Sequence, residues 1–531
     1  MDIGTISLIL LVGMLVLLAI GMPLGFASGF LAVLVLHLKF GPDVLFRTFG
    51  TGVLNVLPQR LYATMTDYVL ISVPLFILMA TLLERSGIAK DMYTSLSMWL
   101  SRTRGGIAVV TAIMAIVMAA MSGIIGGEVV LLGLIALPQM LRLGYNQNLA
   151  VGTICASGSL GTMIPPSIVL IFYGLITETS IHALFQAAFI PGFILAGCYI
   201  LYIIVRTRLH PEQAPLPEPS DDDMLFSDKS KCFVAFVGWL LAIWGAGALI
   251  HATALELQNA FGLLKPDDYD PYSVTSVAKF ALFFGAGMTL PYLAFGKRII
   301  SMAWTMSRGL IAPLIVVFVV LGSIYGGVTG ITEAAGMGTV AVMVLIIARG
   351  EFSLLLVREA LMRTFKSTGT IIWVTLGATA LAGAYTLAGG PTYVAGLISG
   401  ADLPTIGILL VMMAVFLFLG AFMDWVGIVL LVMPVFLPIV KALPVDELGL
   451  FGPLTIDPRF VSVWFGILFC VNMQVSFLSP PFGPAAFYLK SVAPPHISLP
   501  DIFRGFLPFI GIQLFVLMLV LFFPEITMVF R

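Results

Sequence analysis

Long apolar runs alternate with short polar connections over almost the whole chain. A helix needs about 20 apolar residues to cross the hydrocarbon core of a bilayer, so these runs predict membrane-embedded helices. Runs longer than one crossing predict tilted helices, broken helices or hairpins that enter the bilayer and turn back, and we expect roughly 12 to 16 embedded segments. The runs lie near residues 5–38, 67–83, 106–141, 148–175, 183–205, 232–252, 276–296, 310–348, 369–388, 405–440, 460–489 and 505–528.

Composition agrees with an all-α polytopic membrane protein that has the lipid bilayer as its surroundings. Of the 531 residues, 60% are hydrophobic and only 10% are charged, whereas a soluble domain carries roughly a quarter charged residues. The first residues, Met1, Asp2 and Ile3, are not the basic residues that precede the apolar core of a secretory signal. We therefore expect the run at 5–38 to be retained as a membrane span.

Two apolar runs share an unusual feature, a pair of adjacent prolines near the middle. Pro165–Pro166 interrupts the run at 148–175, and Pro480–Pro481 interrupts the run at 460–489. A proline offers no N–H to the carbonyl four residues earlier, and irregular backbone survives in a membrane only where it lines protein or a wet cavity. Paired interrupted helices in two halves of a membrane chain indicate the substrate and ion site of a transporter. The carbonyls predicted to be free are those of Gly161, Thr162, Ser476 and Phe477.

The chain also resembles itself. The segment that begins at Leu18 aligns with the one at Gly327, and Met121–Pro138 aligns loosely with Gly420–Pro434. In each half, a double-proline run follows these two aligned segments, so three features recur in the same order. We therefore assign a first membrane repeat to 1–206 and a second to 308–531. Each repeat has a predicted re-entrant helical hairpin followed by a broken helix, at about 106–141 and 148–175 in the first and at about 405–440 and 460–489 in the second.

Residues 207–307 break this pattern and are interpreted as an insertion. They contain a polar, proline-rich, acidic loop at Pro211–Asp223 and two further apolar runs, which predict two extra spans. An even number of added crossings leaves the relation between the repeats unchanged. The second repeat is therefore inverted if the rest of the first repeat crosses the membrane an odd number of times.

Each predicted hairpin has a polar, glycine-bearing tip, at Ser122–Gly123 and at Gly420–Asp424. Placed against the proline breaks, these tips would gather hydroxyl and carbonyl oxygens, which suit a hard cation such as Na⁺. Small residues also pack membrane helices closely, so any single one could be structural, but the paired sets favour two ion sites. The predicted ion-site residues are Ser122, Gly123, Ser157, Ser159, Gly161, Thr162, Pro165, Gly420, Asp424, Ser476, Ser479 and Pro480.

Three carboxylic acids, Glu128, Glu333 and Asp424, fall in the interior of apolar runs, away from their ends. An ionisable side chain is costly in a membrane and points to function by default. These acids could bind Na⁺, carry a proton or stabilise the start of a helix. Glu333 follows Thr332 at a predicted helix start and is best explained as a cap, whereas both explanations stay open for Glu128 and Asp424 near the hairpin tips.

The sequence lacks the motifs of an energy-coupling or hydrolytic enzyme. It contains no G-x-x-x-x-G-K-[ST] phosphate loop, no G-x-S-x-G turn and no H-E-x-x-H helix. We therefore expect a protein that is not an enzyme, uses no organic cofactor and binds no nucleic acid. Any energy for transport would come from an ion gradient.

These motifs together resemble the large membrane subunit of the tripartite ATP-independent periplasmic (TRAP) transporters. The resemblance covers both repeats and rests on Ser122–Glu128, Ser157–Pro166, Gly330–Ala335 and Ser479–Gly483. It implies an elevator-type carrier, in which a transport domain of two hairpins and two broken helices moves against a scaffold. The insertion at 207–307 is not usual for the family.

The resemblance further implies Na⁺-coupled uptake of a small organic acid across the bacterial cytoplasmic (inner) membrane. The implied partners are a small membrane subunit, expected as a separate chain, and a periplasmic substrate-binding protein. One Na⁺ site would lie at the first tip and break, the other at the second tip and break, and the substrate between them. The residues assigned to the substrate are Ser122, Gly158, Asn472 and Gln474.

Two other functions stay open on the sequence. The chain could be a stand-alone ion-coupled carrier of a related superfamily that takes its substrate directly from solution. It could also be a non-transporting membrane subunit of an enzyme complex, which would call for a relay of intramembrane Lys, Glu and His residues. No lysine is evident in the interior of the apolar runs, away from their ends.

Overall fold

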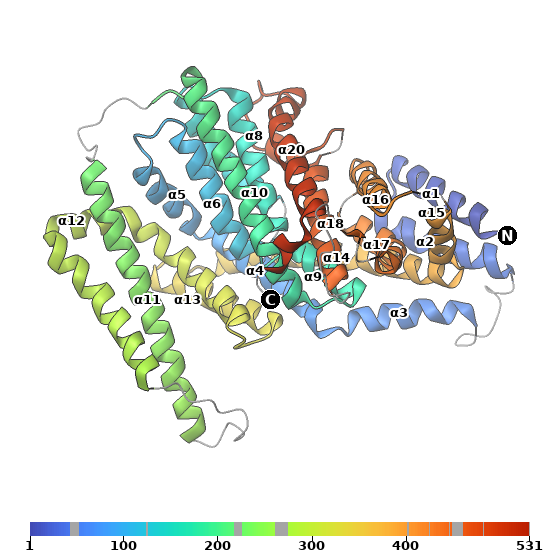
Figure 1. Cartoon of the computed structure of the whole chain (residues 1–531), viewed down its shortest axis with the longest axis horizontal. Coiled ribbons are helices and arrows are strands. Elements are labelled where there is room, and N and C mark those ends of the chain that lie inside the picture. Colours follow the sequence, from blue (N-terminus) through green and yellow to red (C-terminus); the bar gives the residue numbers. More distant parts are fainter. Residues whose placement is uncertain are drawn as a thin grey trace. The chain divides into compact units, whose positions relative to one another are not determined.

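The computed structural model describes residues 1–42, 52–123, 126–216, 226–260, 274–400, 403–423, 425–444, 447–448, 460–481 and 483–529. Within these ranges the chain forms helices and no strands (Figure 1), which confirms the all-α class. Nine of the described helices are long and apolar enough to cross a membrane, and shorter apolar helices of 10–17 residues accompany them. The protein is therefore a multi-pass membrane protein.

The apolar run at 5–38 forms two helices, a division that agrees with its length of more than one crossing. Gly21 has a φ of 86°, which glycine adopts without steric cost, and Pro23 fixes the start of the next helix. The chain therefore turns after Ala19. The helices of this part are α1 (Ile3–Ala19), α2 (Leu24–Phe40), α3 (Val56–Met65), α4 (Ser72–Arg85) and α5 (Ile88–Trp99).

The next apolar runs contain the predicted interruptions. α6 (Gly106–Ser122) and α7 (Gly127–Arg142) flank the first hairpin tip. α8 (Gln147–Gly158) continues into a short 3₁₀ helix, η4 (Ser159–Thr162), and α9 (Ile168–Thr177) follows the double proline. α10 (Ile181–Leu209) is a single long helix.

Two long helices follow in the region predicted as an insertion. α11 (Phe226–Ala260) is one, and α12 (Val274–Tyr325) is the other, with a kink at Gly296. Their described residues pack around a small core of Cys232, Ala303 and Met306, beside an edge-on contact between the rings of Trp239 and Trp304.

The second half repeats the alternation of long and interrupted helices. α12 ends at Tyr325 and α13 begins at Ile331, so the run at 310–348 is also divided at its glycines. The remaining helices are α13 (Ile331–Ala348), α14 (Leu354–Leu387), α15 (Gly390–Ser399), α16 (Thr405–Gly420), α17 (Trp425–Ala442), α18 (Val461–Leu478), α19 (Pro484–Lys490) and α20 (Leu499–Phe522).

Contacts divide the chain into two compact units. One comprises residues 1–90, 104–216 and 312–531, and the other comprises 91–103 and 217–311. Both hairpins and both proline breaks belong to the first unit. The division into two repeats and an insertion is a different partition of the chain and stays a prediction, as do the inversion of the second repeat and the elevator movement.

Within the first unit, each hairpin packs against the interrupted helix of its own half. α6 and α7 contact α8 and η4, and α16 and α17 contact α18. The two interrupted helices also meet each other, because α18 contacts α9 and the Tyr173 hydroxyl donates a hydrogen bond to the Ser462 carbonyl at 2.7 Å. The ends of both hairpins and both breaks are thereby brought into one region.

The long helix α14 runs beside this region. It contacts α2, α3, α4 and α17, and it crosses α2 closely, since a Cβ atom on Gly377 would overlap the Gly25 carbonyl. Two ion pairs tie α14 to the end of α4: Arg363 to Glu84 at 2.9 Å, and Arg85 to Glu359. Charged residues in the first half of α14 therefore hold this helix to α4.

Candidate ion and substrate site

The first hairpin meets the first proline break at Gly123. This residue ends α6 with a φ of 58°, a left-handed conformation that is cheap only for glycine. Its carbonyl accepts a hydrogen bond from the Ile168 N–H at 3.4 Å. A Cβ atom at this position would overlap the carbonyl oxygen of Pro166. Glycine is therefore required by the turn and by the close approach of the break.

The proline breaks leave fewer free carbonyls than the sequence predicts. The Thr162 carbonyl accepts a hydrogen bond from the Ser167 hydroxyl, and the Ser476 carbonyl accepts one from the Ser479 N–H at 3.2 Å. For these two groups the prediction was wrong, because a side chain and a local turn replace the amide that proline lacks. Both Pro165–Pro166 and Pro480–Pro481 are joined by cis peptide bonds.

Two serines of the first break differ in their environment. Ser159 donates a hydrogen bond to the Ala156 carbonyl at 2.7 Å, contacts Gln474 Oε1 at 3.2 Å, and accepts a hydrogen bond from Gln513 Nε2 at 3.5 Å. Ser159 thus joins the interrupted helices of the two halves. Ser157 is fully buried, and its hydroxyl has no hydrogen-bond partner among the described residues.

The second hairpin approaches its break in a similar way. A Cβ atom on Gly420 would overlap the side chain of Ser476, whose hydroxyl donates a hydrogen bond to the Asn472 carbonyl at 3.2 Å. The Ser479 hydroxyl donates to the Val475 carbonyl at 2.8 Å. Asp424, which the sequence assigns to this ion site, lies outside the described residues.

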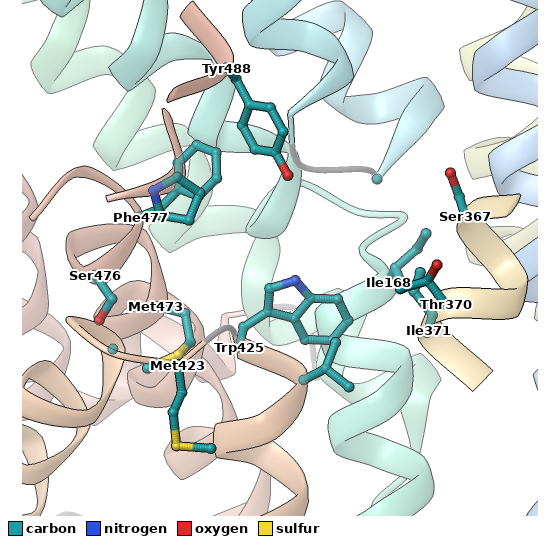
Figure 2. Close-up of a pocket in the computed structure, with 14 residues that line it drawn as sticks. Ile168, Ser367, Thr370, Ile371, Met423, Trp425, Met473, Ser476, Phe477 and Tyr488 are labelled. Atoms are coloured by element: carbon teal, nitrogen blue, oxygen red, sulfur yellow. The ribbon is translucent and has the colours of Figure 1, made fainter. Parts of the chain in front are cut away.

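A cavity of about 340 Å³ opens between these elements (Figure 2). Both hairpins contribute to it, together with the start of α9, the second interrupted helix and one side of α14. In the figure the rings of Trp425 and Tyr488 lie between Ser476 and the Ser367–Thr370 side. The lining residues are Gly123, Ile168, Ser367, Thr370, Ile371, Gly420, Met423, Trp425, Val426, Met473, Ser476, Phe477, Pro484 and Tyr488.

A second cavity of about 210 Å³ adjoins the first and shares Ser367 and Tyr488 with it. It is bounded by α4, by both helices of the first hairpin and by α14. Its charged lining residues in the described part of the chain are Glu84, Glu128 and Arg363. Ser122 also lines it and donates a hydrogen bond to Glu128 Oε1.

The predicted site residues divide into two groups. Gly123, Gly420 and Ser476 line the first cavity, and Ser122 lines the second. The remaining described ones, Ser157, Ser159, Gly161, Thr162, Pro165, Ser479 and Pro480, together with Gly158, Asn472 and Gln474, are not among the lining residues of either cavity.

Three residues assigned to the substrate are engaged within the protein. Gly158 packs against Val129, whose side chain a Cβ atom on Gly158 would overlap, and Asn472 Nδ2 donates a hydrogen bond to the Met413 carbonyl at 3.0 Å. The Gln474 side chain is fully buried beside Ser159. The structure therefore brings these residues next to the predicted ion region without exposing them to either cavity.

Comparison with known proteins identifies the family. A model of the DctM component of tripartite ATP-independent periplasmic transporters matches residues 11–526. The chain belongs to this family of TRAP large permeases. The permease is thus a transport protein and not an enzyme, and its family is that of secondary transporters that depend on a substrate-binding protein.

Individual relatives agree with this assignment. The permease is 25% identical over 483 residues, 90% of each chain, to the C4-dicarboxylate TRAP transporter large permease protein DctM of Pseudomonas aeruginosa. It is 23% identical to the sialic acid TRAP transporter large permease protein SiaM of Vibrio cholerae, over 97% of this chain and 96% of the relative. The solved YdaH transporter of Alcanivorax borkumensis shares the fold, with a TM-score of 0.51, 14% identity and coverage of 94% and 97%.

Several cavity residues of the permease were not predicted from the sequence. Arg363, Ser367 and Thr370 lie on α14, at and just before the start of the apolar run at 369–388, where they look like an ordinary polar flank. Trp425 and Tyr488 follow a hairpin tip and a double proline closely. Their position next to those features was the signal in the sequence that could have identified them.

Proposed function

We propose that the permease couples the inward movement of Na⁺ to the import of an organic acid, which a periplasmic binding protein delivers. The observation that carries the proposal is the cavity bounded by both hairpin ends, by α9 and by the second interrupted helix. A substrate there would touch elements of both halves. Movement of those elements against the rest of the protein, as in an elevator, would carry it across the bilayer.

The ends of the helices support an anionic substrate. Ile168 begins α9 and Trp425 begins α17, and both residues line the first cavity. Helix N-termini carry partial positive charge and favour carboxylates. In the adjoining cavity Arg363 is the cationic side chain among the described lining residues. The lining hydroxyls and aromatic rings would contact the rest of the molecule.

The substrates named for relatives are consistent with this class. One relative carries the name of a C4-dicarboxylate transporter and another that of a sialic acid transporter, both of which are acids. The proposal includes a small membrane subunit as a separate partner chain and a location in the bacterial cytoplasmic membrane. The coupling ion is Na⁺, bound at the two hairpin–break contacts.

Uptake into proteoliposomes tests the proposed function. The permease would be reconstituted with its small subunit, and the binding protein would be supplied with radiolabelled organic acids, with or without an inward Na⁺ gradient. We expect uptake only when both the gradient and the binding protein are present. Uptake without the binding protein would instead indicate a stand-alone carrier. Uptake that is the same with and without the Na⁺ gradient would refute the coupling of transport to Na⁺.

The serines of the two breaks give a first mutational prediction. Ser157→Ala and Ser476→Ala should each raise the half-saturating Na⁺ concentration for uptake by about fivefold, the effect of losing one oxygen ligand worth about 1 kcal/mol. Thr153→Ala is a matched control, because Thr153 is also fully buried with a hydroxyl that lacks a described partner, one turn earlier on α8. If both serine variants respond to Na⁺ as the parent does, the ion sites are misassigned.

A further inference from the structure

A cavity of about 510 Å³ lies within the unit of residues 91–103 and 217–311, between the end of α5 and the first turns of α11. It shares no residue with the two cavities of the candidate site. We call it the basic cavity, because Arg102 and Lys229 line it and none of its described lining residues is acidic. Its lining residues are Trp99, Leu100, Arg102, Thr103, Lys229, Ser230, Phe233 and Val234. The proposed function assigns no role to this part of the permease.

The two cations of the basic cavity come from different segments. Lys229 Nζ donates hydrogen bonds to the Ser101 hydroxyl at 2.9 Å and to the Trp99 carbonyl at 3.5 Å. These bonds hold the lysine against the residues that follow α5. Arg102 is the next residue after Ser101, and it is exposed. Two segments that are far apart in the sequence therefore place their positive charges on one cavity.

The neighbouring acid of α11 already has a basic partner. Asp228 pairs with Lys231 at 3.4 Å, and neither residue lines the basic cavity. Thr103 and Ser230 do line it, and their hydroxyl groups can donate hydrogen bonds to an anion. The described lining of the cavity thus offers positive charge and hydrogen-bond donors, which are the groups that bind phosphate.

The apolar side of the cavity is continuous with the outer surface of α11. Phe233 and Val234 line the cavity and are exposed. Val237 and Leu241, also exposed, follow Phe233 at steps of four residues, a spacing that places all three on one face of the helix. Helix α11 is one of those long and apolar enough to cross a membrane. The cavity therefore lies where the charged start of this helix passes into its apolar part.

A phospholipid matches both parts of the basic cavity. The phosphate of its headgroup suits the basic and hydroxyl groups, and an acyl chain suits the exposed apolar face. Basic pockets between membrane helices bind the headgroups of anionic lipids, and Trp, Lys and Arg side chains are typical of the membrane boundary. Free phosphate would use the charges but would leave the apolar face without a role, so the arrangement favours a lipid.

We propose that the basic cavity binds the headgroup of an anionic phospholipid, with an acyl chain along Phe233, Val237 and Leu241. The lipid phosphate contacts Arg102 and Lys229 together, so it connects the end of α5 with the start of α11. The site is separate from the cavities that serve transport, and the proposal does not depend on Na⁺ coupling.

Native mass spectrometry of the purified permease–small subunit complex tests this proposal. The complex would be titrated with phosphatidylglycerol, which is anionic, or with phosphatidylcholine of the same acyl chains, which has no net charge. We expect tighter binding of phosphatidylglycerol. Lys229→Ala and Arg102→Ala should each weaken that binding by about fivefold, which corresponds to about 1 kcal/mol for one basic side chain at an anionic lipid.

A neighbouring lysine provides the matched control. Lys231→Ala removes the same charge from the same helix, two residues away, but Lys231 does not line the basic cavity. This variant should bind phosphatidylglycerol within about twofold of the parent. Lys229→Arg keeps the charge and should keep most of the affinity. If Lys229→Ala does not fold because its bond to Ser101 is lost, Arg102→Ala tests the site alone, since Arg102 is exposed.

Three results would overturn the proposal. Equal losses in the variants of Lys229, Arg102 and Lys231 would show a diffuse attraction of lipids to basic residues and no site. Equal binding of the two lipids by the parent would show that the cavity does not select an anion. Displacement of phosphatidylglycerol by excess inorganic phosphate would indicate a site for a soluble anion. A loss confined to the variants of Lys229 and Arg102, with phosphate without effect, supports the lipid site.

Discussion

A permease with Gly123→Ala is expected to fold and reach the membrane but to transport at about one hundredth of the parent rate. Gly123 has a φ of 58°, and an alanine in that conformation costs about 1–2 kcal/mol. Its Cβ atom would also overlap the Pro166 carbonyl oxygen, so the hairpin tip must move away from the break. A displacement of about 1 Å at a reacting site costs on the order of 100-fold in rate in enzymes, and we expect a comparable loss here.

Gly350→Ala separates the two causes of this loss. Gly350 has a φ of 71°, and a Cβ atom there would meet nothing within 4 Å. This variant carries the same backbone cost without the overlap, so it should transport within about twofold of the parent. Initial uptake rates, normalised to the amount of permease in the membrane, make the comparison. Equal losses in both variants would mean that the contact between tip and break is unimportant.

The sequence predicted the interruptions of the helices because their causes are local. The double prolines at 165–166 and 480–481 cannot continue a helix, and the glycines of the first hairpin tip permit a turn. The composition of the runs likewise determines the all-α class, since each backbone polar group in a membrane must be satisfied within its own helix. These features need no knowledge of distant contacts.

Other features depend on which segments meet, and local patterns do not contain that information. The carbonyl of Thr162 is satisfied by Ser167, a choice that depends on how the chain turns after the prolines. The charged first half of α14 looked like a connection because charges usually flank membrane spans. In this half of α14, Arg363 pairs with Glu84 at the end of α4, a residue far away in the sequence. Only the fold shows that both residues line a cavity.

The second large effect on uptake is expected for Arg363, which pairs with Glu84 at the second cavity. Arg363→Ala should lower uptake by at least about tenfold, equivalent to about 1.4 kcal/mol. Glu84 and Glu128 would then line one cavity of about 210 Å³ with no cation from the described lining residues. Removing one partner of a fully buried pair costs about 3–5 kcal/mol. The side chains of Arg363 and Glu84 are 39% and 18% exposed, so water reduces the cost below that range.

A double variant and a neighbouring ion pair show whether charge balance is the cause. Glu84→Gln combined with Arg363→Ala removes both charges, so uptake should recover at least in part relative to Arg363→Ala alone, a coupling that a double-mutant cycle measures. Arg85→Ala breaks the adjacent pair with Glu359, whose side chains are 39% and 42% exposed and which lines neither cavity. Since exposed pairs contribute about 0–1 kcal/mol, that variant should transport within about twofold of the parent. A double variant as inactive as Arg363→Ala would instead show that the guanidinium acts directly, as it would if it bound the carboxylate of the substrate.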